Sequence, residues 1–118
     1  MANQKLLKTS LVRKGWEYDK VYSRGKRLHG RGFALVYLSN LSGRSRLGIS
    51  VHRKIRGAVK RNRIKRIVRE SFRLDREQYP AGADIVFAVR QGFSYSHPSD
   101  VSEAVNSLTC GITGLRQA

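Results

Sequence analysis

A row of cations along one predicted helix is the feature of this sequence with the clearest chemical use. Asn62, Arg66, Arg69 and Arg73 recur at i, i+4, i+7 and i+11, so in a helix they gather between about 140° and 200° from Ile64. A guanidinium can donate two parallel N–H bonds to phosphate oxygens and can stack on bases. The pattern therefore predicts a surface that binds a polyanion, and it favours nucleic acid over an acidic protein.

The helix that carries this row must bury its opposite side. Its apolar side chains fall within about 80° of Ile64, and we expect the helix to run from about Ala58 to Arg76. Glu70 is predicted to lie toward Arg63 and to leave the row unneutralised. The side chains predicted to share the core with Ile64 are Ile67, Val68, Ser71 and Phe72.

The charge of the chain is large and unevenly distributed. The net charge is +16 and the isoelectric point is near 11.1. Residues 51–76 hold eleven Lys and Arg against two acids, whereas residues 77–118 hold two against four. Segregated charge of one sign indicates a polyanionic partner rather than a need for solubility alone. A membrane surface is disfavoured, because the helix side opposite the arginines is needed by the core.

A second candidate surface consists of aromatic residues. Tyr18 and Tyr22 lie one turn apart on an earlier predicted helix, where they could pack into the core or offer rings on which unpaired bases stack. Two aromatic residues of the following predicted strand could complete a cleft, with cations at its edge. The predicted cleft comprises Tyr18, Tyr22, Phe33, Tyr37, Lys54 and Arg90.

Two further residues have more than one interpretation. Trp16 lies off the apolar side of the first helix and is equally compatible with a partly exposed platform and with a packed indole. Cys110 is the only cysteine, so it indicates a small buried or half-buried thiol and excludes a disulfide framework within the chain. We expect a cytoplasmic location as the default, because the sequence also shows no signal-peptide pattern and no apolar run long enough to span a membrane.

The elements that must position these residues predict an α+β fold, an α/β sandwich. Strand patterns at 32–40, 46–51 and 84–90, with a weaker edge strand at 26–31, give the order α-β-β-β-α-β-α around a four-stranded mixed sheet. The turn residues "NLSG" predict an antiparallel hairpin between the strands at 32–40 and 46–51. Residues 1–118 form one domain, in which we expect residues 1–10 to be flexible and residues 111–118 to fray.

The sequence offers no catalytic site of its own. His29, His52 and His97 are scattered, and no pair of carboxylates has the spacing expected for two metal ions. Phosphate-binding loop and nucleophile motifs are absent. We therefore predict no catalytic residue and no metal ligand in the chain, no small-molecule substrate and no membrane partner.

The segment "AVKRNRIKRIVRESFR" resembles the arginine-asparagine-arginine signature of the bacterial ribonuclease P protein component family. "YDKVYSRGKR" is similar to the first helix of that family, and "RLGISV" and "DIVFAVR" stand where the family has strands. The resemblance covers roughly residues 10–110. The chain departs from the family pattern directly after "RLGISV", with His52-Arg53-Lys54 in place of a Ser-Lys-Lys type sequence and Arg56 in place of a glycine.

The resemblance implies the protein subunit of an endoribonuclease that removes the 5′ leader of precursor tRNA and leaves a 5′-phosphate on the tRNA. It implies that the RNA subunit carries the chemistry with Mg²⁺ ions, and that the leader binds in the cleft between the first helix and the sheet. The alternatives are a structural RNA-binding protein of the ribosomal type and a nuclease acting alone. The residues predicted to bind the RNA subunit are Arg61, Asn62, Arg63, Lys65, Arg66, Arg69 and Arg73.

Overall fold

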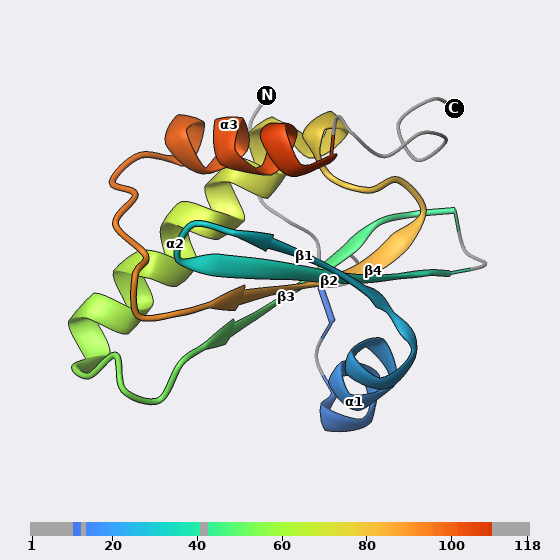
Figure 1. Ribbon diagram of the computed structural model, residues 1–118, viewed down its shortest axis with the longest axis horizontal. Coiled ribbons are helices and arrows are strands. Elements are labelled where there is room, and N and C mark those ends of the chain that lie inside the picture. The colour runs from blue at the N-terminus through green and yellow to red at the C-terminus, as the bar shows by residue number, and fades with distance from the viewer. Residues whose placement is uncertain (1–10, 13, 41–42, 110–118) are drawn as a thin grey trace.

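The computed structural model describes residues 11–12, 14–40 and 43–109. They form one four-stranded sheet with helices on both faces, as the sequence predicted (Figure 1). The expectations for residues 1–10 and 111–118 lie outside the described residues. In chain order the elements are α1 Gly15–Arg24, β1 Lys26–Gly30, β2 Phe33–Ser39, β3 Arg46–Val51, α2 Ala58–Leu74, the short 3-10 helix η2 Arg76–Gln78, β4 Ala83–Val89 and α3 Pro98–Thr109.

The strand order across the sheet is β1-β2-β4-β3. β2 is antiparallel to both of its neighbours, β1 and β4, whereas β3 and β4 are parallel. The predicted hairpin between β2 and β3 is therefore wrong, because β4 lies between them. The strand–helix–strand segment from β3 through α2 to β4 explains the difference, since strands joined through a helix can pair in parallel. The weaker prediction of an edge strand at 26–31 is confirmed by β1.

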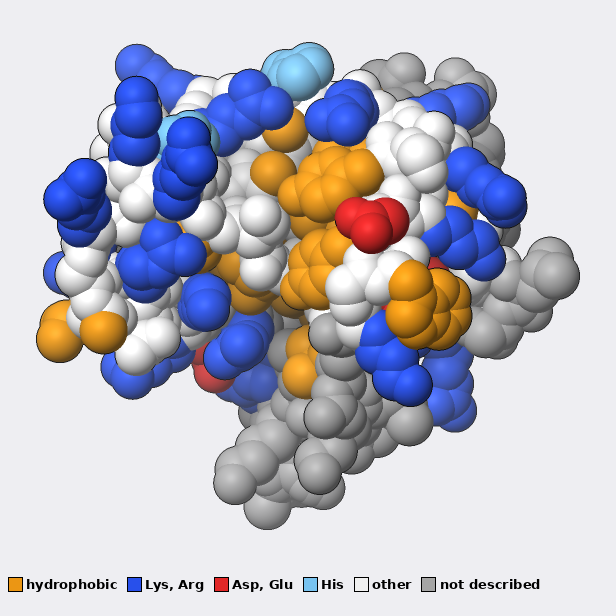
Figure 2. Space-filling view, turned by 90° about the horizontal axis from the view of Figure 1, so that it is seen from below, with side chains coloured by type: hydrophobic (Ala, Val, Ile, Leu, Met, Phe, Trp, Pro, Cys, Tyr) orange, Lys and Arg blue, Asp and Glu red, His pale blue; other side chains and the backbone are white. Residues whose placement is uncertain are grey.

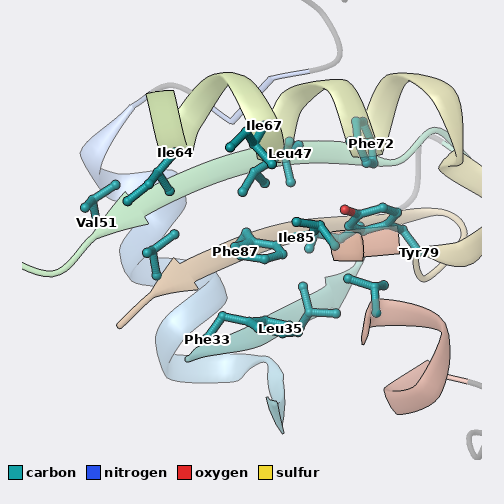
Figure 3. Close-up of a cluster of buried hydrophobic side chains, with 14 of the residues drawn as sticks. Phe33, Leu35, Leu47, Val51, Ile64, Ile67, Phe72, Tyr79, Ile85 and Phe87 are labelled. Atoms are coloured by element: carbon teal, nitrogen blue, oxygen red, sulfur yellow. The ribbon is translucent and has the colours of Figure 1, made fainter. Parts of the chain in front are cut away.

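The two central strands are buried on both faces. Alternate side chains of β2, such as Phe33 and Leu35, point into a large core beneath α2 and α3 together with Phe87 of β4 (Figure 3). The intervening side chain Val36 packs with Val86 and with Val21 of α1 in a smaller cluster on the other face. Figure 1 shows the consequence: α1 lies on one side of the sheet, and α2 and α3 lie on the other.

The predicted apolar stripe of α2 is confirmed. The buried residues of this helix are Ile64, Ile67, Val68, Ser71 and Phe72. The helix begins after Gly57, whose φ of 96° suits glycine, and it ends at Leu74 rather than continuing through Arg76. None of the described helices is long and apolar enough to cross a bilayer.

A chain of buried hydroxyl groups joins α2 to α3. The Ser71 hydroxyl is 2.7 Å from the Tyr79 hydroxyl and 2.7 Å from the Ser102 hydroxyl, and Ser102 in turn donates to the Asp75 carboxylate at 2.7 Å. Burial raises the pKa of Tyr79 well above its ordinary value, although the hydrogen bond with Ser71 opposes the rise. Buried hydroxyls in such a chain depend on one another, because removing one leaves its neighbours without a partner.

Replacing Ser102 should therefore destabilise the fold. We expect Ser102→Ala to lower the free energy of unfolding by about 1–3 kcal/mol, because Ser71 and Asp75 each lose a partner. Ser107→Ala on the same helix is the matched control, since Ser107 is exposed. Its effect should stay within about 0.5 kcal/mol. Urea denaturation of both variants measures the difference, and equal effects would mean that the hydroxyl chain contributes nothing specific.

Candidate RNA-binding surfaces

The first candidate surface is the side of α2 that faces away from the sheet. Asn62, Arg66 and Arg69 are exposed there, as is the neighbouring Arg63, while Lys65 is half-buried. The helix thus has the predicted polarity, with the core stripe on one side and the cations on the other. We call Asn62, Arg66, Arg69 and Arg73 the α2 row.

Arg61 has a different role from its neighbours. Its guanidinium donates to the carbonyl oxygens of Val51, His52 and Ile55 at 3.3, 3.1 and 2.9 Å. These carbonyls belong to the end of β3 and to the loop before α2, so Arg61 holds this loop against the helix. We therefore leave Arg61 out of the α2 row, although the sequence had placed it among the RNA-binding residues.

Arg73, at the C-terminal end of the row, is paired within the helix. Its Nε donates to Glu70 at 3.1 Å, and the two side chains form an ion pair. The prediction that Glu70 leaves the row unneutralised is therefore wrong at Arg73. The more strongly cationic part of the row is the exposed stretch from Asn62 to Arg69.

The second candidate surface is the sheet face that carries α1. Cross-strand register places its side chains in rows that run across the strands. The middle row lies beneath α1, with Val21 packed on its two central valines. From one edge of the sheet to the other this row is Gly48, Val86, Val36 and Arg27.

Tyr18 covers the β3 end of the middle row. A Cβ atom on Gly48 would lie 2.7 Å from the Tyr18 hydroxyl oxygen, so only glycine leaves room for the ring as it is placed. Burial raises the pKa of Tyr18, and a hydrogen bond from the Ile49 backbone and the charge of Arg69 act against the rise. β3 is an edge strand, so part of its backbone has no neighbouring strand to pair with. The hydrogen bond from the Ile49 backbone to Tyr18 satisfies one of these backbone groups.

Tyr22 covers the opposite end of the row, toward β1. The Arg27 guanidinium lies 5.5 Å from the centre of the Tyr22 ring, and its Nη2 donates to the Tyr22 carbonyl oxygen at 3.4 Å. The sequence analysis missed Arg27, because only the register of β1 with β2 reveals that its side chain shares a face with α1. The cation–π contact presents a positive charge beside the ring.

The next row along the strands has small side chains. Ala34, Ala88 and Ser50 lie side by side on β2, β4 and β3, and His29 extends the row onto β1. We call Ala34, Ala88 and Ser50 the small-residue row; the larger, exposed His29 ends it at β1. Ala34 is fully buried, whereas Ala88 and Ser50 are half-buried, so the accessible part of this row lies on β4 and β3. Figure 2 shows hydrophobic side chains along the middle of this side of the molecule, with Lys and Arg on both flanks.

Phe33 and Tyr37 do not contribute to this surface. Phe33 is 1% exposed and stacks on Phe87 at 4.7 Å between ring centres, and Tyr37 is 7% exposed in the same core. Both point toward α2 and α3, on the far face of the sheet from Tyr18 and Tyr22. The prediction that they complete a cleft with the tyrosines is therefore wrong. Successive side chains of a strand face opposite sides of the sheet, and α1 packs on the set that includes Val36, not on the set that includes Phe33 and Tyr37.

Lys54 and Arg90 are exposed beyond the small-residue row. Arg90 directly follows β4, and its backbone N–H donates to the Gly32 carbonyl oxygen at 2.9 Å. Lys54 lies in the loop after β3, where the His52 backbone N–H continues the ladder by donating to Val89 at 2.9 Å. These cations stand at the strand ends nearest the small-residue row, as a charged edge of the surface requires.

At the opposite end of the same sheet face, Arg46 joins α1 to the sheet. Its guanidinium binds both oxygens of Asp84 at 2.8 Å and one oxygen of Glu17 at 3.0 Å. Glu17 also accepts the backbone N–H of Lys14 at 3.1 Å, which caps the start of α1, and Asn40 donates to Asp84 at 2.9 Å. This ion cluster fixes the position of α1 on the sheet, and hence the position of both tyrosines.

The described residues contain no group of three His, Cys, Asp or Glu side chains that could hold a metal ion. His52 accepts the backbone N–H of Lys54 on its Nδ1 at 3.1 Å. That ring nitrogen is therefore used within its own loop.

The described residues define a basic α+β protein, with a mixed sheet that carries a cationic helix on one face and aromatic rings on the other. The family model for ribonuclease P matches residues 6–112. The chain is 63% identical over 111 residues to the ribonuclease P protein component of Desulfotalea psychrophila, covering 94% of this chain and 92% of that one. It is 39% identical over 98 residues to the protein of the same name from Pelotomaculum thermopropionicum, covering 83% and 88%.

Solved structures agree with the sequence matches. The RNase P protein from Thermotoga maritima superposes with a TM-score of 0.74 at 31% identity, covering 92% of this chain and 96% of that one. The chain belongs to the ribonuclease P protein component family. The family match confirms the resemblance of "AVKRNRIKRIVRESFR" to the family signature. Members of this family are subunits of an endoribonuclease.

The ion cluster at Arg46 should make the stability of the fold depend on pH. The hydrogen bonds from Arg46 are the main cause that lowers the pKa of Asp84, and Asn40 adds to the effect. The stabilisation is thus present above the pKa of an unfolded aspartate, about 3.9, and is lost as pH falls through the lower folded value. We expect Asp84→Asn to cost about 1–3 kcal/mol at pH 6.

The same variant should lose less stability than the wild type as the pH falls below about 4. Urea denaturation at pH 6 and pH 3 measures both effects. Glu77→Gln is the control, because Glu77 is exposed in η2, and it should leave the pH dependence unchanged. If the free energy of unfolding of Asp84→Asn falls between pH 6 and pH 3 as steeply as that of the wild type, Asp84 does not carry the acid sensitivity.

Proposed function

We propose that this chain is the subunit that binds the catalytic RNA of ribonuclease P through the α2 row and binds the 5′ leader of precursor tRNA on the α1 side of the sheet. The separation of the two surfaces by the sheet is the observation that carries this proposal. The row on α2 suits a structured RNA contacted at its phosphates, whereas exposed ring surface suits bases that are free to unstack.

The proposed leader site differs from the predicted cleft in its floor. Tyr18 and Tyr22 form its wall, the half-buried Ala88 and Ser50 form its floor, and Lys54 and Arg90 stand at its edge. Small side chains next to aromatic rings leave room for a base to lie against a ring, and the nearby cations favour its phosphates. Arg27 adds charge beside Tyr22.

The Mg²⁺ ions of the reaction are proposed to bind mainly to the RNA subunit and to the substrate. Hydrolysis of a phosphodiester at such ions needs the strand to be held in place and its charge to be neutralised. The contribution of this chain is then to hold the leader and to offset repulsion between two polyanions. The same proposal implies a cytoplasmic location, where its RNA partners are made.

The two surfaces should be separable by substitution. We expect Tyr22→Ala to weaken binding of precursor tRNA with a leader by about 1–2 kcal/mol, the value for one stacked base. Its affinity for mature tRNA and for the RNA subunit should barely change. The measurement is a leader-length series made in excess RNA subunit, and Tyr22→Phe is the control because it keeps the ring. Equal weakening of leadered and leaderless substrates would reduce Tyr22 to a packing residue.

Arg66→Ala should have the opposite effect. It removes a phosphate contact of the α2 row, so assembly with the RNA subunit should weaken whether or not a leader is present. The thermal midpoint should stay unchanged or rise slightly, because repulsion between like charges on the helix is relieved. Arg31→Ala removes the same charge from the turn between β1 and β2 and serves as the control. An equal loss of assembly in both variants would argue against a specific row.

Binding to the RNA subunit should also depend steeply on salt. If the basic surfaces neutralise some six phosphates, the logarithm of the affinity should fall with the logarithm of salt concentration with a slope of about −4 to −5. Titrations between 50 and 400 mM salt would measure it. A slope shallower than about −2 would mean that most of the positive charge does not contact RNA.

A further inference from the structure

The outer side of α1 carries a feature that neither surface described above uses. Trp16 is 62% exposed, which makes it the most exposed aromatic side chain among the described large hydrophobics. Lys20 follows one turn later and Arg24 one turn after that, and both are exposed. We call Trp16, Lys20 and Arg24 the α1 crest. Successive members are spaced by about 6 Å along the helix axis.

From the α1 crest we infer a second contact for single-stranded RNA, in which a base of the 5′ leader stacks on Trp16 and its flanking phosphates meet Lys20 and Arg24. The inference rests on the proposed function, since it extends the path of the same leader. An isolated exposed apolar residue is common on protein surfaces. An indole followed by cations at helical spacing, in a chain of net charge +16, is complementary to nucleic acid.

The leader is favoured over the RNA subunit by the position of α1. The helix lies on the opposite face of the sheet from the α2 row (Figure 1). An RNA held along the α2 row is therefore separated from the α1 crest by the sheet. A leader held at Tyr22, by contrast, already contacts α1.

The distance between the two contacts fits a continuing strand. Trp16 and Tyr22 are six residues apart and about 120° apart around the helix, so the path between them over the helix surface is roughly 15 Å. A few nucleotides span this distance. Asp19 lies between them and is exposed, and its charge would keep phosphates away from the middle of the path. Glu17, the other acid of α1, is bound to Arg46.

Trp16 is the only tryptophan in the chain, so its fluorescence reports on this contact alone. The experiment uses the protein assembled with the RNA subunit and adds precursor tRNAs with leaders of increasing length. We expect tryptophan emission to be quenched, and acrylamide to lose access to the indole, only when the leader exceeds the length that reaches Tyr22. The RNA subunit alone and mature tRNA should leave the emission unchanged.

Affinities provide the second measurement. Trp16→Ala should weaken binding of long-leader precursors about fivefold or more, which corresponds to about 1 kcal/mol for one stacked base. Short-leader and mature tRNA should bind as they do to the wild type. Trp16→Phe should retain part of the affinity for long leaders that Trp16 contributes. Tyr22→Ala should weaken short and long leaders alike. The two variants therefore distinguish failure of this inference from failure of the proposed leader site.

Three results would overturn the inference. One is an indole that remains fully accessible to acrylamide in the long-leader complex. Another is quenching by the RNA subunit alone, which would assign the α1 crest to that RNA. The third is an equal loss of affinity for all leader lengths in Trp16→Ala, which would mean a general effect on α1 rather than a distal contact.

Discussion

Burial of β2 and β4 on both faces is the constraint on which the rest of the structure depends. Each of these strands presents apolar side chains in both directions, so the sheet has no face that can be left to water and needs helices on both sides. The helices then have outer sides that point in opposite directions. Two surfaces that could contact different RNAs are thus a consequence of how the central strands alternate, before any charge is considered.

Several of the eight acids of the chain form internal pairs, and three of them join different elements of this arrangement. Glu17 and Asp84 share Arg46 between α1, β3 and β4, Asp75 ends the hydroxyl chain between α2 and α3, and Glu70 pairs with a neighbour on its own helix. Folding of a chain with net charge +16 is opposed by its own repulsion. Internal pairing of the acids strengthens the fold, yet it leaves the exposed cations of α2 available for phosphate.

The parts of the fold that depend on local periodicity could be predicted from the sequence. The core stripe of α2 follows from a period of 3.6 residues and agrees with the structure residue by residue. The pairing of β2 with β4 could not be read locally, because the turn after β2 has the chemistry of a hairpin and the true partner is more than 40 residues away. The assignment of Phe33 and Tyr37 to the same side of the sheet as Tyr18 and Tyr22 failed for a similar reason. Both alternating sets of β2 are apolar, and only the packing of α1 decides which set it covers.

The roles of individual arginines depend on tertiary contacts that composition does not reveal. Arg61 and Arg66 stand in one motif, but Arg61 reaches back to the carbonyls of the preceding loop while Arg66 stays exposed. Arg69 lies close enough for its charge to act on Tyr18, so the α2 row and the wall of the proposed leader site approach each other around the edge strand β3. If the two surfaces bind as proposed, the catalytic RNA and the leader would meet at this edge, and β3 would set the distance between them.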